Sequence, residues 1–270
     1  MVNFLAIKKQ NIRYFLEFIF IIYLVFWGPL SPFNPFIAGF SCITREDITL
    51  CIDDKDDIQL KEKFQVIEKA QERVLSFWED RTSYPDKVKI FLVSDNRYWH
   101  MSMYNNDSSA LVQGNNIIVN YRYVKHFLED VLTHEISHHY LSSKLPLGIF
   151  VRYKVPRWLD EGLAVIISEE KYYEIENFNN YEKHFKAGGV VGSLKSGLEW
   201  SRGVSRLGSN FIYSYSNSFV RYLIETFGKE KIQHYLNSLS LFSDVDYVFQ
   251  EIYQESPSSL EKKWLINMGG

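Results

Sequence analysis

Apolar and polar residues alternate in recognisable periods from about residue 58 onward. From Ile58 to Trp78 the apolar residues fall at helical spacing, which predicts an amphipathic helix. The run VKIFLV at 88–93 predicts a strand, and ALVQGNNIIVN at 110–120 predicts a strand or hairpin that turns at Gly114. The first part of the folded region therefore combines one helix with short strands.

The second half of the chain is expected to contain helices only. Helical periodicity occurs at about 124–141, 157–170, 215–227, 229–239, 243–253 and 258–266. The second and third of these helices are separated by a Tyr/Asn-rich stretch and the loop-like segment AGGVVGSLKSG. A small sheet followed by a run of helices predicts the α+β fold class.

A long apolar run opens the chain. Lys8, Lys9 and Arg13 precede residues 14–27, which are apolar except for Glu17. Basic residues followed by an apolar run are typical of a signal peptide or an uncleaved signal anchor. We expect a membrane anchor here, and the sequence leaves open whether it is cleaved.

This interpretation divides the chain into an anchor at 1–40, an acidic juxtamembrane linker at 41–57 and a folded domain at 58–268. The positive end of the anchor is expected in the cytoplasm, so the rest of the chain would lie on the extracytoplasmic side. In an oxidising compartment Cys42 and Cys51 can close a short loop, whereas in the cytosol they would be two thiols.

Charge excludes one class of partner. The formal net charge is −3, so the sequence gives no support for nucleic-acid binding, which calls for a basic patch. The aromatic share of 16% fits a large core or a substrate groove without choosing between them.

The helix at 124–141 carries His134-Glu135-Ile136-Ser137-His138, the pattern H-E-x-x-H. Residues four apart lie on one face of a helix, so both imidazoles can bind one metal ion. Glu135 lies at the edge of that face, within reach of a water molecule beside the metal. Both histidines fall on the apolar stripe of their helix, where a lone histidine is usually an ordinary core residue. Two at ligand spacing with a carboxylate between them indicate a metal site.

Glu161 is the candidate third ligand. It follows in the segment PRWLDEGLA, on the same apolar stripe as Trp158 and Val165. A carboxylate on such a stripe must be paired or bind a metal, because an uncompensated buried charge is costly. The alternative is a salt bridge to a lysine or arginine. Asp160 and Asp130 lie on other faces of their helices and are weaker candidates.

H-E-x-x-H followed by a helix with W-L-x-E-G-x-A resembles the gluzincin zinc metallopeptidases, especially the aminopeptidase-type branch and the small peptidase MA-like domains. The resemblance extends from about Ile58 to Ile266. Residues 215–228 are similar to the tyrosine-bearing helix of those domains, and residues 245–264 to their C-terminal helical pair. Val165 stands where thermolysin has an aspartate, and the sequence lacks the G-x-M-E-N segment by which aminopeptidases read an amino terminus.

The resemblance implies a thermolysin-like domain of two lobes, an upper lobe at about 58–144 and a mostly helical lower lobe at about 145–268. A peptide or protein substrate would bind between them, paired with the edge strand at 110–120. The other implied partner is a membrane, through the anchor, and none is a nucleic acid.

The resemblance also implies the chemistry of the site. One Zn²⁺ per chain would be bound by His134, His138 and Glu161. Glu135 would act as the general base of peptide-bond hydrolysis. Tyr215 would donate a hydrogen bond to the oxyanion; Tyr213 is the substitute for that role, or both tyrosines simply pack.

The sequence leaves two other hypotheses of function open. One is a catalytically silent gluzincin-like domain that binds zinc or a peptide for regulation. Glu135 argues against it, because a non-catalytic site has no need of that carboxylate. The other is a structural membrane protein in which the motif is a coincidence.

Overall fold

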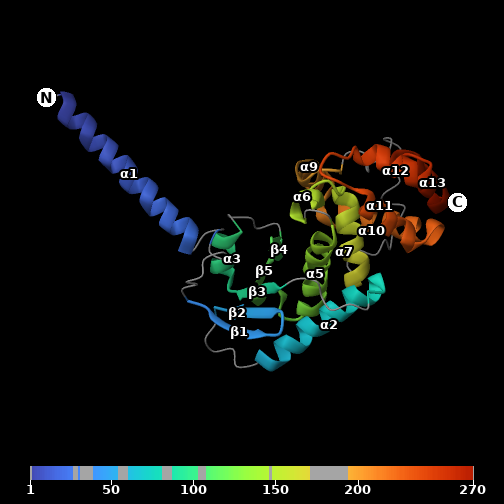
Figure 1. Ribbon diagram of the computed structural model, residues 1–270, viewed down its shortest axis with the longest axis horizontal. Helices are drawn as coiled ribbons and strands as arrows, with labels where there is room; N and C mark the ends of the chain where they lie inside the picture. Colours follow the sequence, from blue (N-terminus) through green and yellow to red (C-terminus); the bar gives the residue numbers. More distant parts are fainter. Residues whose placement is uncertain are drawn as a thin grey trace. The chain divides into compact units, whose positions relative to one another are not determined.

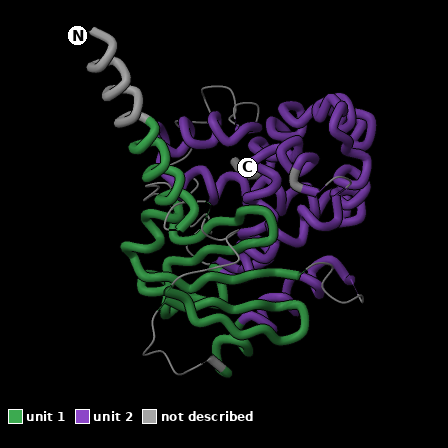
Figure 2. The backbone as a smooth tube through the Cα atoms, turned by 60° about the vertical axis from the view of Figure 1, so that its left-hand side comes forward, with its two compact units in different colours: residues 1–66, 86–131 green, residues 67–85, 132–270 purple. Residues whose placement is uncertain are grey.

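The computed structural model describes residues 2–26, 30, 39–53, 60–80, 87–102, 108–145, 148–170 and 194–269. The chain divides into two compact units (Figure 2). Unit 1 comprises residues 1–66 and 86–131, and unit 2 comprises residues 67–85 and 132–270. The divisions fall within α2 (Leu60–Trp78) and α5 (Leu128–Lys144), so each of these helices contributes to both units.

Unit 1 contains a five-stranded sheet in the order β1-β2-β3-β5-β4 (Figure 1). Its strands are β1 (Ser41–Arg45), β2 (Ile48–Ile52), β3 (Val88–Val93), β4 (Ala110–Gln113) and β5 (Asn116–Asn120). β2, β3 and β5 run parallel, and the edge strands β1 and β4 are antiparallel to their neighbours. The three parallel strands are buried along most of their length, as is usual for parallel strands. The strand and hairpin predicted at 88–93 and 110–120 are confirmed.

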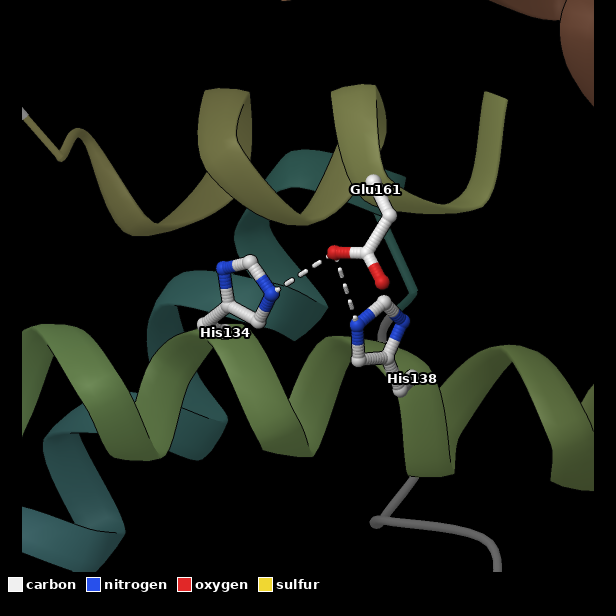
Figure 3. Close-up of side chains that lie close together, drawn as sticks. All are labelled: His134, His138 and Glu161. Carbon is white, nitrogen blue, oxygen red and sulfur yellow. Dashed lines mark hydrogen bonds and ion pairs between the residues drawn. The ribbon is translucent and has the colours of Figure 1, made fainter. Parts of the chain in front are cut away.

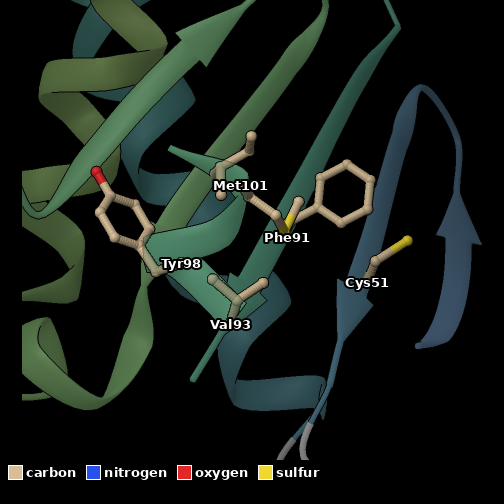
Figure 4. Close-up of a cluster of buried hydrophobic side chains, with 6 residues drawn as sticks. Cys51, Phe91, Val93, Tyr98 and Met101 are labelled. Atoms are coloured by element: carbon tan, nitrogen blue, oxygen red, sulfur yellow. The ribbon is translucent and has the colours of Figure 1, made fainter. Parts of the chain in front are cut away.

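One apolar cluster of unit 1 connects the sheet to α3 (Asp95–Met101) (Figure 4). Cys51 pairs in register with Phe91, and Phe91 pairs with Ile118, so the three side chains form one row across β2, β3 and β5. Tyr98 and Met101, three residues apart on α3, complete the cluster and are almost fully buried.

The segment predicted as a linker at 41–57 instead supplies two strands, and residues 54–57 lie outside the described part of the chain. Cys42 and Cys51 are direct partners in the β1–β2 register and form a disulfide. The acidic residues around β2 suggested a solvated linker, but its own run ITLCI is buried beside β3. The apolar content of that short run outweighs the polarity of its flanks.

The N-terminal helix is α1 (Val2–Phe26). Among the described residues no helix is both long enough and apolar enough to cross a membrane. The anchor predicted at 1–40 is therefore unsupported by the structure, and residues 1, 27–29 and 31–38 of that prediction lie outside the described part of the chain.

Among the described residues three short helices were not predicted as separate elements, and α3 of unit 1 is the first of them. The helix expected at 124–141 is divided into α4 (Tyr121–Val124), which directly follows β5, and α5. A one-turn helix, α6 (Ile149–Arg152), precedes the helix that carries Glu161.

All regular elements of unit 2 within the described residues are helices. After α6 they are α7 (Arg157–Ser168), α9 (Gly197–Leu207), α10 (Ser209–Phe227), α11 (Lys229–Ser238), α12 (Val245–Tyr253) and α13 (Pro257–Gly269). The helices predicted at about 157–170, 215–227, 229–239, 243–253 and 258–266 are confirmed. α9 was not predicted, and residues 187–193 of the loop expected before it lie outside the described part of the chain. Together with the sheet of unit 1, the helices of unit 2 make the chain a mixed α+β protein.

Close packing of α7 against α10 fixes the orientation of α7. A Cβ atom built on Gly162 would lie 2.7 Å from the carbonyl oxygen of Ser216 and 2.7 Å from Cγ2 of Val220, so only glycine allows this approach. One turn earlier, the fully buried ring of Trp158 lies 5.2 Å from the ring of Phe219, centroid to centroid. These contacts determine which way the residues between 158 and 162 point.

We expect Gly162→Ala to lower the free energy of unfolding by about 1–3 kcal/mol, because the added methyl group must displace α10 backbone. Thermal unfolding would detect this as a fall in Tm of about 2–4 °C per kcal/mol. Gly197→Ala is the matched control, since a Cβ atom there meets nothing within 4 Å. Equal Tm values for the two variants would contradict the close approach of the helices.

Candidate metal centre

His134 and His138 from α5 and Glu161 from α7 come together within unit 2 (Figure 3). Their ligand atoms all lie within 4.8 Å of one another. Oε2 of Glu161 is 3.2 Å from Nε2 of His134 and 3.5 Å from Nε2 of His138. The three residues are buried, with 8%, 3% and 1% of their surface exposed.

This donor set fits a metal ion. Two imidazole nitrogens and one carboxylate oxygen converge on one point, which is the three-ligand pattern of a catalytic zinc site. The chemistry of the ring nitrogens agrees, because in each histidine Nε2 faces Glu161 while Nδ1 faces a different carboxylate. A histidine that donates Nδ1–H to a carboxylate keeps the Nε2 lone pair for a metal.

The two Nδ1 contacts differ in quality. Nδ1 of His138 lies 2.7 Å from Oδ1 of Asp160 in a hydrogen bond. Nδ1 of His134 lies 3.1 Å from Oε1 of Glu170, an ion-pair distance without hydrogen-bond alignment. Burial lowers the pKa of both imidazoles, but the facing carboxylates outweigh it, so the pKa of each ring is raised above its ordinary value.

An arginine compensates the buried charge of Glu161 on α7. Arg157 pairs with Oε1 of Glu161, one turn along the same helix. The salt bridge weighed from the sequence is therefore present, but it uses one carboxylate oxygen and leaves the other facing the histidines. Burial raises the pKa of Glu161, but Arg157 and the two histidines outweigh that effect and hold the carboxyl group ionised.

Glu135 is almost as buried as the three ligands, with 9% of its surface exposed. Burial raises the pKa of its carboxyl group above the ordinary value, against the opposite effect of His134 and His138. The group can therefore accept a proton more readily than a carboxylate in water.

The structure does not bring Tyr215 to this cluster. Its hydroxyl donates a hydrogen bond to Glu261, and its ring packs edge-on against Trp264 at a centroid distance of 4.9 Å. The tyrosine beside the cluster is Tyr213, whose ring centroid lies 6.2 Å from that of His134. The structure therefore places the substitute, Tyr213, beside His134, and the oxyanion role itself stays a prediction.

The physical reason is the rotation of α10. The helix begins at Ser209, six residues earlier than the sequence suggested. Ser216 and Val220 face Gly162, and a residue three positions before Ser216 lies on that same face. That residue is Tyr213.

Sequence reasoning missed the outer partners of the ligands. Arg157 had a usable signal, because it lies four residues before Glu161 on a predicted helix. Asp160 was considered only as a metal ligand, and Glu170 and Arg152 carried no local signal. Their contacts depend on how α5, α6 and α7 pack.

Comparison with known proteins gives a family. A family model described as the Peptidase MA superfamily matches residues 108–269, more than half of the chain and all the residues of the cluster. No curated protein matches the chain significantly.

We expect the purified protein to bind one divalent metal ion per chain and His138→Ala to lose it, because two remaining ligands hold a metal poorly. Metal analysis after dialysis measures the stoichiometry. Bound metal should also raise the stability of the wild type, by about 2.7 kcal/mol at a free concentration of 100 Kd, and leave that of His138→Ala unchanged. Exposed His234 supplies the control, His234→Ala. Equal metal content in all three proteins would contradict the site.

Proposed function

Because the chain belongs to the Peptidase MA superfamily, we propose that it is a zinc metallopeptidase that hydrolyses peptide bonds. The observation that carries the proposal is the convergence of both Nε2 atoms on one oxygen of Glu161, with buried Glu135 beside them on α5. Zinc is favoured over other metals because two imidazoles and one carboxylate are its usual ligands in a hydrolytic site.

We assign the chain to the gluzincin group and, within it, to the aminopeptidase-type branch. The third ligand is a glutamate on a helix that follows the H-E-x-x-H helix, which supports the group. The motif W-L-x-E-G-x-A around Glu161 supports the branch. The substrate class is a peptide or protein.

His134, His138 and Glu161 would hold the zinc ion, which would polarise the scissile carbonyl as a Lewis acid and lower the pKa of the attacking water. Glu135 takes a proton from that water while the water oxygen forms a bond to the carbonyl carbon. The same carboxyl group then delivers the proton to the amine nitrogen as the C–N bond breaks. Burial raises the pKa of this carboxyl group, which favours its protonated form between the two steps.

Tyr213 is proposed as the hydrogen-bond donor to the oxyanion. Its ring lies beside His134 and is oriented edge-on by Trp200, with a centroid distance of 5.1 Å. The side chain is only partly buried, so a substrate can reach it. A donor positioned before the reaction stabilises the negative charge that develops on the carbonyl oxygen.

We also propose that the domain lies on the extracytoplasmic side, with residues 1–40 as a signal anchor. The basic residues before the apolar run support this placement, as does the disulfide between Cys42 and Cys51, since disulfides persist in oxidising compartments. Protease added to intact cells or spheroplasts should digest the domain. Protection of the domain from protease until the cells are lysed would contradict this location.

Glu135→Gln should abolish peptide hydrolysis while the zinc content stays at the wild-type level, because the residue is a base and not a ligand. General-base catalysis contributes about 10²–10⁴-fold, and the loss should be at least that large. Cleavage of a peptide library with parallel metal analysis measures both quantities. Glu225→Gln, an exposed carboxylate on α10, should change neither. Wild-type turnover in Glu135→Gln would be incompatible with the mechanism, and zinc binding without cleavage by the wild type would favour the silent binding module.

Tyr213→Phe should lower kcat by about 10²–10³-fold, since one oxyanion donor is lost. Tyr215→Phe is the matched comparison in the same helix. It removes the hydrogen bond to Glu261 and should lower the free energy of unfolding by about 1–3 kcal/mol, with kcat preserved in the folded enzyme. Steady-state kinetics at saturating substrate and thermal unfolding separate the two effects. The reverse assignment would be supported by a large kcat loss in Tyr215→Phe alone.

A further inference from the structure

Asp160 is a buried carboxylate that is not one of the three ligands. It directly precedes Glu161 on α7 and has 4% of its surface exposed. An ionised group in such a place is costly unless it is paired, and Asp160 is paired on both of its oxygens. What it pairs with indicates its role.

One oxygen of Asp160 binds the second histidine ligand. Oδ1 accepts a hydrogen bond of 2.7 Å from Nδ1 of His138, while Nε2 of the same ring faces Oε2 of Glu161 at 3.5 Å. Two consecutive residues of α7 therefore hold the imidazole of His138 from its two nitrogens. This arrangement assigns the proton to Nδ1 and leaves Nε2 directed at the point shared with His134.

The other oxygen of Asp160 is held by arginine. Oδ2 accepts hydrogen bonds from Arg152, at 3.0 Å from Nη2 and 3.3 Å from Nε, and from Arg157 at 3.4 Å. The two guanidinium groups compensate the buried charge of this carboxylate. A charged acceptor fixed from behind by a guanidinium has little freedom to rotate away from the ring.

We propose that Asp160, held in place by Arg152, is a positioning residue that sets the tautomer and ring orientation of His138 for metal binding. The proposal rests on the zinc site of the proposed function. Glu170 faces His134 in a corresponding place but with a looser contact: its side chain is 15% exposed and its ion pair is not aligned as a hydrogen bond. The two carboxylates should therefore contribute unequally.

A different role for Asp160 would be to neutralise Arg152 and Arg157 without acting on the metal. In that case its removal would change the stability of the metal-free protein and leave the intrinsic metal affinity of the folded state unchanged. Measurements on metal binding and on the geometry of the bound ion separate the two roles.

The experiment compares wild type, Asp160→Asn and Glu170→Gln, with Asp246→Asn as the control for losing a carboxylate from an ion pair remote in sequence. Zinc affinity is measured by competition with a chelator, and the visible absorption of the Co²⁺-substituted protein reports the ligand geometry. Asp160→Asn should bind zinc about 10–100-fold more weakly, with an altered cobalt spectrum. Glu170→Gln should show a smaller loss, and Asp246→Asn none.

Unchanged zinc affinity and an unchanged cobalt spectrum in Asp160→Asn would overturn the proposal, and so would a larger loss in Glu170→Gln than in Asp160→Asn. A wild type that binds no zinc would overturn the proposed function itself, which separates the two failures. If Asp160→Asn does not fold, Arg152→Gln tests the same point, because it removes the two shorter hydrogen bonds to Oδ2 without removing the acceptor for His138. It should weaken zinc binding several-fold, and an unchanged affinity would overturn the positioning role.

Discussion

Two adjacent carboxylates buried on α7 are the constraint around which the candidate site is organised. Asp160 and Glu161 have 4% and 1% of their surface exposed, and charges so far from water must be compensated. Arg152 forms an ion pair with one oxygen of Asp160, and Arg157 forms one with an oxygen of Glu161. The remaining oxygens face the histidines of α5. Oδ1 of Asp160 faces Nδ1 of His138, and Oε2 of Glu161 faces both Nε2 atoms, where a divalent cation would bind.

The helical framework of unit 2 keeps these groups in register. Gly162 lets α7 lie against the backbone of α10, and Trp158 fixes the same helix one turn earlier. Because a helix is rigid over one or two turns, these contacts determine where the side chains of Asp160 and Glu161 point. The same packing rotates α10 so that Tyr213 faces the cluster. Structural packing and candidate chemistry therefore depend on the same few residues.

Features that depend on spacing along one helix could be predicted from the sequence, whereas features that depend on packing between elements could not. The spacing of His134 and His138 follows from helix geometry alone, and Glu161 was marked by its place on an apolar stripe. The contacts of Asp160 with His138 and Arg152 were not predicted, because these two partners lie on other helices. The position of Tyr213 beside His134 could not be predicted, because the rotation of α10 is set by packing at Gly162. The strands at 41–52 were missed because the acidic residues that flank the short apolar run ITLCI led to the prediction of a solvated linker.

The central claim is that a zinc ion occupies the point shared by the two Nε2 atoms and Oε2 of Glu161. Anomalous diffraction from a crystal, recorded on both sides of the zinc absorption edge, tests this claim most directly. The account predicts one peak per chain, about 2.0–2.2 Å from each of those three atoms. A peak bound by other side chains, or none in crystals grown with zinc, would contradict it.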